Sequence, residues 1–512
     1  MRKPRILHPI LLAIYPVLHL YYVNRDQLPL SVIFVPGLEI AAIALGLWTL
    51  GRLVLRDGAK AGLLTSFLLV WFFSYGHVLR MAGSGMRQRY LLSLWALLLV
   101  VGVVGILRTR RNLLPFQQVL NVVSGALLAL LLLNIGLYTF GARAQGREQE
   151  EAGQQIAVDP AATVAPAAHK MKERPPDIFY VILDSYAGSS TLQTYFQYDN
   201  SRFYQDLRQR GFYVAERSHS NYPFTLTSVP SSLNMDYLNA LSAQLGPDSK
   251  DFRVIMGRIK NNAVKRFLSA QGYRCLAIDS PDSIWGTEFW DMLLQTTVLM
   301  SVGTGDFAWR RQRTLDAFQK IEAAAGSKQP TFVYAHIYCP HAPYVFEANG
   351  EPVRASYRQR LHLVTQEETR KLYTDQVAYI SKRTTQMIDT LLAKSAVPPV
   401  IIVQADHGPR DLTPPAAPTD TLLQQYYPIL NAYHLPHNGD KRLYDSISPV
   451  NSFRVVLDTY FGTRLPLLKD ESYFCTYSAP LRFTNVTQRL HDLEKGRAGA
   501  KSQTAWEPRA AR

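Results

Sequence analysis

The hydrophobic pattern divides the chain into two parts. The N-terminal part contains five long apolar stretches, at about 6–23, 30–50, 61–79, 90–107 and 117–140, separated by short basic connections. About 20 apolar residues in a helix cross the hydrocarbon core of a bilayer, so each stretch predicts a membrane-spanning helix. The first stretch is too long, and too closely followed by others, to be a cleaved signal peptide.

Basic residues between the apolar stretches indicate how this part is oriented. If the N-terminus lies in the cytoplasm, nine arginines and lysines fall on the inner side and four on the outer side. The inner set is Arg2, Lys3, Arg5, Arg52, Arg56, Lys60, Arg108, Arg110 and Arg111, and the outer set is Arg25, Arg80, Arg87 and Arg89. Cytoplasmic loops are enriched in basic residues. We therefore expect a protein of the cell membrane whose residues after about 140 lie outside the cytoplasm.

The remainder of the chain predicts a linker, a folded domain and a tail. Residues 141–174 lack periodicity and large apolar residues, so we expect a flexible linker there. Strand-like and helix-like runs alternate over 175–488, and residues 489–512 should form a disordered tail. The strand-like runs cover 178–184, 273–279, 331–338 and 399–405, and the helix-like runs cover 201–210 and 367–394. This alternation predicts an α/β fold, an α/β/α sandwich with a mostly parallel sheet.

Charge and cysteine content narrow the class of protein. The formal net charge is +15, but much of the excess flanks the apolar stretches, and no basic stripe with interleaved aromatic residues follows them. We therefore expect no nucleic-acid binding. The cysteines, Cys275, Cys339 and Cys475, show neither zinc-ligand spacing nor a disulfide framework, although one disulfide would be compatible with an extracytoplasmic domain.

Two of the strand-like runs end in metal-binding residue types. The first run ends at Asp184, and the run at 399–405 is followed by Asp406, His407 and Gly408. Because ligands of parallel sheets bind at the carboxyl ends of the strands, these side chains should meet at one sheet edge. Carboxylates and imidazole suit a divalent metal ion, so the pattern predicts a zinc, manganese or magnesium site.

A segment rich in hydroxyl groups could supply a nucleophile. Pro230 is tolerated near a helix start, so the segment 218–234 predicts a helix that begins at about 225–229. A hydroxyl there would lie where backbone N–H groups and the helix dipole favour an anion. Metal coordination would make it nucleophilic. Thr225, Thr227 and Ser228 all fit, and the alternative is that they only cap the helix.

Three further residues could contact a substrate. His341 follows a strand-like run and a proline, so it should lie on a loop at the same sheet edge. There it could bind a second metal, hold a substrate phosphate or protonate a leaving group. His336 lies inside an apolar run, where a substrate contact competes with a buried structural role. Arg410 follows Gly408 closely enough to contact an anion.

Together these residues resemble the alkaline phosphatase superfamily, and within it the sulfatase-like branch. That branch includes membrane-anchored phosphoethanolamine transferases and lipoteichoic acid synthases. The resemblance covers about 175–462 and rests on four pieces: Asp177-Ile-Phe-Tyr-Val-Ile-Leu-Asp184, the segment 225–233, His336-x4-His341-x-Pro343 and Ala405-Asp-His-Gly408. It implies that Asp184, Asp406 and His407 bind the metal, that Thr225 is a nucleophile in contact with it, and that His341 contacts the substrate phosphate.

The chain also departs from the pattern of these enzymes. The sulfatase nucleophile motif C-x-P-x-R is absent, which argues against a true sulfatase. Related transferases usually carry Glu where Asp184 stands, and they extend the Asp-His-Gly motif with acidic residues and a later His, where this chain has Pro409 and Arg410.

The resemblance implies a membrane-anchored hydrolase or transferase that acts on phosphodiesters, with a phospholipid or an envelope glycan as substrate. The alternatives are simple hydrolysis of a phosphate or sulfate ester, and an inactive member that assists envelope polysaccharide assembly.

Overall fold

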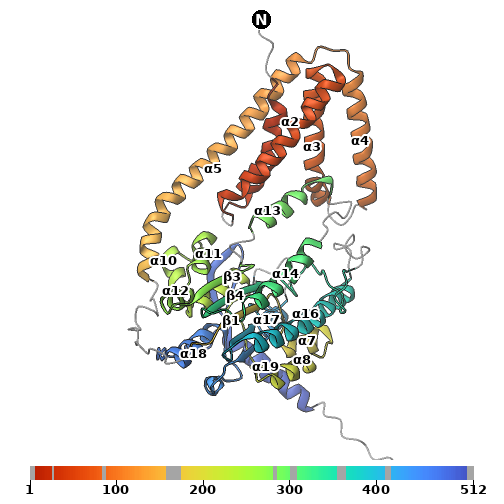
Figure 1. Ribbon diagram of the computed structural model, residues 1–512. Coiled ribbons are helices and arrows are strands. Elements are labelled where there is room, and N and C mark those ends of the chain that lie inside the picture. Colours follow the sequence, from red (N-terminus) through yellow and green to blue (C-terminus); the bar gives the residue numbers. More distant parts are fainter. Residues whose placement is uncertain are drawn as a thin grey trace, which may run out of the picture. The chain divides into compact units, whose positions relative to one another are not determined.

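The computed structural model describes residues 6–25, 28–82, 88–156, 174–280, 285–299, 308–353, 365–409 and 417–503 (Figure 1). The described residues form two compact units. The first unit takes those within Met1–Glu150 and Ile284–Asp306, and the second takes the rest. We describe each unit by itself.

The first unit contains the five predicted apolar helices, and the short 3-10 helix η1 (Leu30–Ile33) lies between the first two. They are α1 (His8–Val23), α2 (Phe34–Leu55), α3 (Gly58–Ala82), α4 (Gln88–Arg108) and α5 (Leu114–Ile156). Four segments are long and apolar enough to cross a membrane: Leu30–Leu55, Gly58–Met81, Arg89–Arg108 and Leu114–Phe140. The 16 residues of α1 make a shorter apolar helix, about 24 Å long against a hydrocarbon core of about 30 Å. Helix α5 continues to Ile156 and so includes residues 141–156 of the expected linker, whereas 157–173 lie outside the described residues.

A segment far along the chain also packs in this first unit. Helix α13 (Trp285–Leu294) buries Phe289 and Leu293 in one apolar cluster with residues of α1, α2, α3 and α5. Just after α13, the carbonyl of Thr296 accepts a hydrogen bond of 2.9 Å from the backbone N–H of Gly76 in α3. A Cβ at Gly76 would lie 2.1 Å from the carbonyl oxygen of Gln295, so only glycine permits this approach.

The second unit is built on a six-stranded sheet with the order β2-β6-β5-β1-β4-β3. Its strands are β1 (Ile178–Leu183), β2 (Tyr213–Val214), β3 (Arg274–Ile278), β4 (Thr331–Ile337), β5 (Val400–Gln404) and β6 (Asn431–His434). Strands β5, β1, β4 and β3 are parallel, and β6 runs antiparallel to both β5 and β2. The predicted mostly parallel sheet is thus confirmed, with β1 at its centre.

Helices cover both faces of this sheet. The helices of the second unit are α7 (Ser189–Phe196), α8 (Ser201–Gln209), α9 (Thr225–Asn234), α10 (Asn239–Leu245), α11 (Phe252–Lys260), α12 (Ala263–Ala270), α14 (Ala308–Ala324), α16 (Gln366–Lys394), α17 (Asp420–Tyr426), α18 (Pro449–Phe461) and α19 (Thr487–Gln503). Alternate side chains of β1 serve opposite faces. Phe179 packs with Phe318 of α14 and Ile380 of α16, whereas Tyr180 meets Phe453 of α18 with ring centroids 5.0 Å apart. The unit is therefore a three-layer α/β/α sandwich.

A buried polar network lies on the α18 side of the sheet. The Tyr180 hydroxyl donates to Gln404 Oε1 at 2.8 Å, and Gln404 Nε2 donates to Asn431 Oδ1 at 2.9 Å and to Ser452 Oγ at 3.0 Å. These bonds link β1, β5, β6 and α18. Because a buried polar group without a partner is costly, the network favours one register of the three strands.

Three smaller features complete the second unit. A separate hairpin pairs β7 (Tyr473–Thr476) with β8 (Ala479–Asn485), and η5 covers Gly439–Arg442. Helix α19 includes 489–503 of the expected disordered tail, and 504–512 lie outside the described residues. All three cysteines are free, so the disulfide that the sequence left open does not form.

Candidate metal centre and active site

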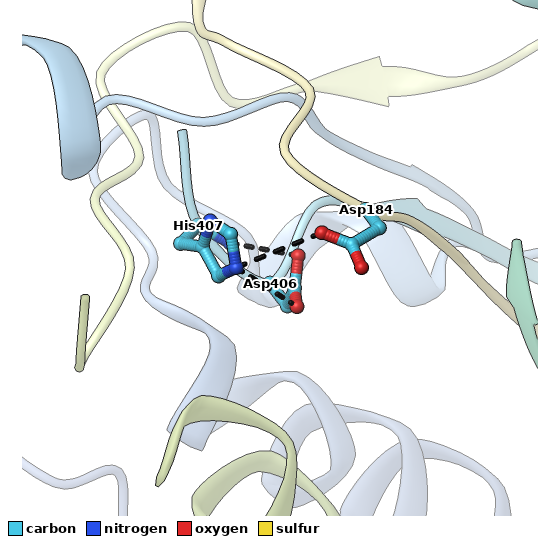
Figure 2. A group of neighbouring side chains, drawn as sticks. All are labelled: Asp184, Asp406 and His407. Carbon is cyan, nitrogen blue, oxygen red and sulfur yellow. Dashed lines mark hydrogen bonds and ion pairs between the residues drawn. The ribbon is translucent and has the colours of Figure 1, made fainter. Parts of the chain in front are cut away.

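The strand register brings two distant carboxylates to one sheet edge. Strand β1 pairs with β5 so that Ile178 faces Val400 and Ile182 faces Gln404. Asp184 lies two residues after Ile182, and Asp406 lies two residues after Gln404. His407 follows Asp406 directly. Figure 2 shows the three side chains turned toward one another. One ligand atom from each lies within 4.8 Å of the others.

This cluster has the composition of a metal site. His407 Nε2 lies 3.6 Å from Asp184 Oδ1 and 3.5 Å from Asp406 Oδ2, and all three side chains are buried. Two buried carboxylates at such range repel each other, so a cation between them would be stabilising. Two carboxylates and one imidazole fit zinc, manganese or magnesium.

The His407 ring is held in the tautomer that a metal requires. Its Nδ1 lies 2.8 Å from the carbonyl oxygen of Gly408. A carbonyl can only accept a hydrogen bond, so Nδ1 carries the proton. The lone pair of Nε2 therefore faces the carboxylates, and the Gly408 carbonyl acts as the outer partner that orients a metal-binding histidine.

Gly408 has a steric role in this loop. A Cβ at this position would lie 2.1 Å from the carbonyl oxygen of Gln425, and the Gly408 N–H donates to the Tyr426 carbonyl at 2.6 Å. The loop after β5 thus contacts the end of α17 directly. Only glycine allows this contact, which fixes the backbone of the residue directly after His407.

Among the three hydroxyls that the sequence left open, Thr225 alone contacts ligand atoms of the cluster. Its Oγ1 donates to Asp406 Oδ2 at 2.6 Å and lies 3.3 Å from His407 Nε2. Thr227 Oγ1 instead donates to the Phe224 carbonyl at 3.1 Å, and Ser228 Oγ donates to the Asp406 carbonyl at 2.6 Å. Helix α9 begins at Thr225, so this hydroxyl stands at a helix N-terminus.

The three residues expected to contact substrate lie in different settings. His336 is fully buried in β4, and its Nε2 lies 3.1 Å from Asp184 Oδ2, so it contacts a metal-ligand candidate instead of an open surface. His341 is half-buried, with its ring centroid 6.4 Å from that of His407. Its ring contacts the Ala342 carbonyl, and its backbone N–H donates to the Asp184 carbonyl at 3.0 Å. Arg410 lies outside the described residues.

Ser185 is a site residue that the sequence reasoning missed. Its φ of +64° lies in the left-handed region. Its backbone N–H donates to Asp406 Oδ1 at 3.2 Å, and its Oγ donates to Asp184 Oδ1 at 3.1 Å. Serine rarely adopts a positive φ, so nothing in the residue type indicates this turn, and its place directly after Asp184 was the one usable signal.

The surroundings shift the pKa values of Asp184 and Cys339 in opposite directions. Burial raises the pKa of Asp184, but His341, His336 and His407 outweigh that effect and hold the pKa of this carboxyl below its usual range. Burial and the nearby Asp184 raise the pKa of the Cys339 thiol well above its usual value. Asp184 is thus ready to bind a cation, and Cys339 is an inert thiol.

Comparison with known proteins gives structural likenesses only. No protein-family model and no curated protein matches the chain. It is similar to the integral membrane lipooligosaccharide phosphoethanolamine transferase A (EptA) of Neisseria meningitidis, at 13% identity and a TM-score of 0.37, over 89% of this chain and 94% of that one. The zinc complex of the C-terminal periplasmic domain of EcEptC from Escherichia coli matches at 12% identity and a TM-score of 0.39, over 63% and 96% of the two chains.

A sulfatase also matches. BT1596, a 2-O GAG sulfatase, is 12% identical, with a TM-score of 0.36, over 60% of this chain and 74% of that one. These three structures are thus two phosphoethanolamine transferases and a sulfatase. At this level of identity and TM-score they do not assign an activity to this chain, which has to be argued from the site.

Proposed function

We propose that this chain is a membrane-anchored, metal-dependent enzyme that cleaves phosphodiesters through Thr225 and transfers the phosphoryl group to an acceptor. One observation carries the proposal. The Thr225 hydroxyl lies 2.6 Å from Asp406 Oδ2 and 3.3 Å from His407 Nε2, at a helix N-terminus beside a buried carboxylate–imidazole cluster. This combination of a nucleophile, metal ligands and backbone N–H groups suits the chemistry of a phosphoryl anion.

The donor set supports a divalent cation held by Asp184, Asp406, His407 and Thr225. When bound, the cation would lower the pKa of the hydroxyl and offset the negative charge on the phosphoryl group. The chain itself contributes orientation: the Gly408 carbonyl fixes the His407 tautomer, and Ser185 holds the Asp406 carboxylate. The site is thereby organised before the substrate arrives.

The reaction would proceed by double displacement. Thr225 Oγ1 forms a bond to phosphorus while the bond from phosphorus to the leaving oxygen breaks. The hydroxyl proton leaves along its hydrogen bond to Asp406 and is returned to the departing alkoxide, so the first half-reaction balances. In the second half, an acceptor hydroxyl or water attacks the phosphothreonine, and its proton passes to the released Thr225 oxygen. His341 and Arg410 would contact the equatorial phosphate oxygens.

The membrane anchor supports a lipid substrate. In this proposal the first 140 residues anchor the chain, residues 141–174 link the two parts, and residues 175–488 form the extracytoplasmic catalytic domain. Four helices long and apolar enough to cross a membrane support the anchor. The excess of basic residues on the inner side favours a domain outside the cytoplasm when the shorter helix α1 crosses as a fifth span. A phospholipid headgroup is the donor that we propose, and an envelope glycan or lipid is the acceptor.

The test is intact-mass analysis of the full-length protein in detergent after incubation with phosphatidylethanolamine or phosphatidylglycerol. We expect an added headgroup phosphate that disappears in Thr225→Ala and is retained in Thr227→Ala, the matched control two residues further along α9. An adduct that persists in Thr225→Ala would show that another residue is the nucleophile. Product analysis with and without an acceptor alcohol then distinguishes transfer from hydrolysis. A protein that binds no divalent metal and forms no adduct would be an inactive member, and the proposal would be wrong.

A further inference from the structure

We infer that His336 is a positioning residue that holds Asp184 in the orientation required of a metal ligand. The inference rests on the proposed metal site and assigns His336 a different role from substrate binding. His336 Nε2 lies 3.1 Å from Asp184 Oδ2. The side chain of His336 is 0% exposed and that of Asp184 is 3% exposed, so no solvent competes for this contact.

The sheet register places His336 beside Asp184. Strand β4 is parallel to β1, and His336 pairs with Ile182, two residues before Asp184. Side chains two residues apart in a strand point to the same face, so His336 and Asp184 lie on one side of the sheet. The contact follows from the strand pairing and does not depend on a loop.

Neighbouring rings restrict rotation of the His336 imidazole. The Tyr338 ring stacks on it with centroids 4.5 Å apart and an interplanar angle of 26°. The Arg313 guanidinium lies 5.2 Å from the centre of the Tyr338 ring, and its Nε donates to Asp279 Oδ2 at 3.0 Å. The imidazole is therefore one member of an ordered stack that reaches from β4 to the turn after β3.

Hydrogen-bond chemistry fixes the protonation of this ring. An ionised carboxylate can only accept, so Nε2 carries the proton that it shares with Asp184. Nδ1 is buried and has no hydrogen-bond partner among the described residues. His336 thus donates its hydrogen bond to Asp184 from Nε2.

This hydrogen bond gives the two Asp184 oxygens different roles. Oδ2 is engaged by His336, and Oδ1 faces His407 Nε2 at 3.6 Å. The group of three side chains whose ligand atoms converge within 4.8 Å does not include His336. His336 therefore acts on the ligand, as the outer partners of metal-binding groups do. Loss of such partners typically weakens metal binding about 10- to 100-fold.

The experiment measures Zn²⁺ affinity of the full-length protein in detergent, by competition with a chromophoric chelator at neutral pH. His336→Leu removes the donor but keeps the volume, and we expect about 10- to 100-fold weaker binding. His336→Gln can still present an N–H to Asp184 and should bind Zn²⁺ within about threefold of the unsubstituted protein. His434→Leu is the control, because His434 on β6 bonds the Pro399 carbonyl at 2.8 Å, at the opposite end of β5.

The outcomes separate this inference from the proposed function. If the unsubstituted protein binds Zn²⁺ and His336→Leu binds it equally well, His336 has no positioning role, while the metal site stands. If His336→Gln is as weak as His336→Leu, the hydrogen bond is not the cause and the inference is also wrong. If the unsubstituted protein binds no divalent metal, the proposed function fails first. Should His336→Leu not fold, His336→Asn, whose shorter amide falls short of Asp184, is expected to show the same loss of affinity.

Discussion

The backbone N–H of Ser185 donates a hydrogen bond of 3.2 Å to Asp406 Oδ1, across 221 residues of sequence. Ser185 has a φ of +64°, so the chain turns away from the direction of β1 immediately after this N–H. Two candidate ligand loops are thereby joined through a backbone group. The Asp406 carboxylate is thus held by the backbone of the residue after Asp184.

Substitutions at Ser185 should separate backbone conformation from side-chain chemistry. Ser185→Val places a β-branched residue at positive φ, which costs about 2 kcal/mol, and should lower the thermal midpoint by several degrees. Ser185→Gly adopts this φ freely and should change the midpoint little, although it loses the hydroxyl near Asp184. Thermal unfolding of both variants is the measurement. A Val variant as stable as the Gly variant would mean that the turn is not constrained as described.

Gly408→Ala should be strongly destabilising. The added methyl group would lie 2.1 Å from the Gln425 carbonyl oxygen, and backbone cannot rotate away as a side chain can. Overpacking of this kind costs about 1–3 kcal/mol or more, and the shift should also reduce metal affinity. Gly257→Ala in α11 is the matched control, because nothing lies within 4 Å of its Cβ position, and it should stabilise the helix slightly. Equal thermal midpoints for the two variants would contradict this account.

Metal removal should lower stability as well as activity. The buried carboxylates of Asp184 and Asp406 repel each other when no cation lies between them, and a ligand that binds only the folded state raises its stability. Chelation is expected to lower the thermal midpoint and to abolish adduct formation, and added Zn²⁺, Mn²⁺ or Mg²⁺ to restore both. Asp406→Asn removes both a metal ligand and this repulsion, so its midpoint should be the same with and without metal. A chelator that leaves the thermal midpoint unchanged is the result that counts against the site.

The fold should lose stability in mild acid partly through His434. Burial lowers the pKa of this imidazole, and its bond to the Pro399 carbonyl offsets that only in part. Below about pH 6.5, the ordinary value for histidine, the unfolded chain takes up a proton that the folded chain does not. Stability must then fall as the pH falls. Thermal midpoints measured from pH 8 to pH 5 should drop more steeply for the unsubstituted protein than for His434→Leu, and parallel curves would exclude this contribution.

The ring of Tyr477, between β7 and β8, should influence the reactivity of Thr225. It stacks on Phe224 with centroids 4.3 Å apart and an interplanar angle of 17°, and Phe224 is the extended residue directly before Thr225. An aromatic pair of this kind contributes about 0.5–1.5 kcal/mol. Tyr477→Ala should slow adduct formation about two- to tenfold if the stack orients the start of α9, and Tyr477→Phe should not. Equal rates in Tyr477→Ala and the unsubstituted protein would show that the stack is not needed.

Much of the fold followed from local patterns. Continuous apolar runs predicted β1, β4 and β5 within a residue or two, because these strands are buried on both faces and carry no polar alternation. The partly exposed edge strand β3 was also predicted within one residue. The packing of α13 among the apolar helices was not predicted. Its residues show an apolar pattern, but a pattern does not say which of two hydrophobic surroundings a helix joins, and that depends on contacts such as Gly76 with Thr296.

The residues of the candidate site that directly follow strand ends were predicted from the sequence. Asp184, Asp406 and His407 meet because the carboxyl ends of parallel strands share an edge. The contact of His336 with Asp184 depends on the exact register of β4 against β1, which no local signal fixes. The choice among Thr225, Thr227 and Ser228 depends on the direction of each hydroxyl at the start of α9. All three residues carry a hydroxyl, so the residue type does not distinguish them.

The alternation of side chains between the two faces of β1 limits which insertions this strand can accept. Tyr180, Ile182 and Asp184 are spaced by two, as are Gln404 and Asp406, so each carboxylate emerges on the layer that holds α18. One extra residue inserted in β1 would turn Asp184 toward the layer of α14 and α16, where apolar side chains fill the space. The aspartate would keep its place in the chain but could no longer share a cation with His407. The chemistry of this edge therefore tolerates no odd-numbered insertion or deletion in β1.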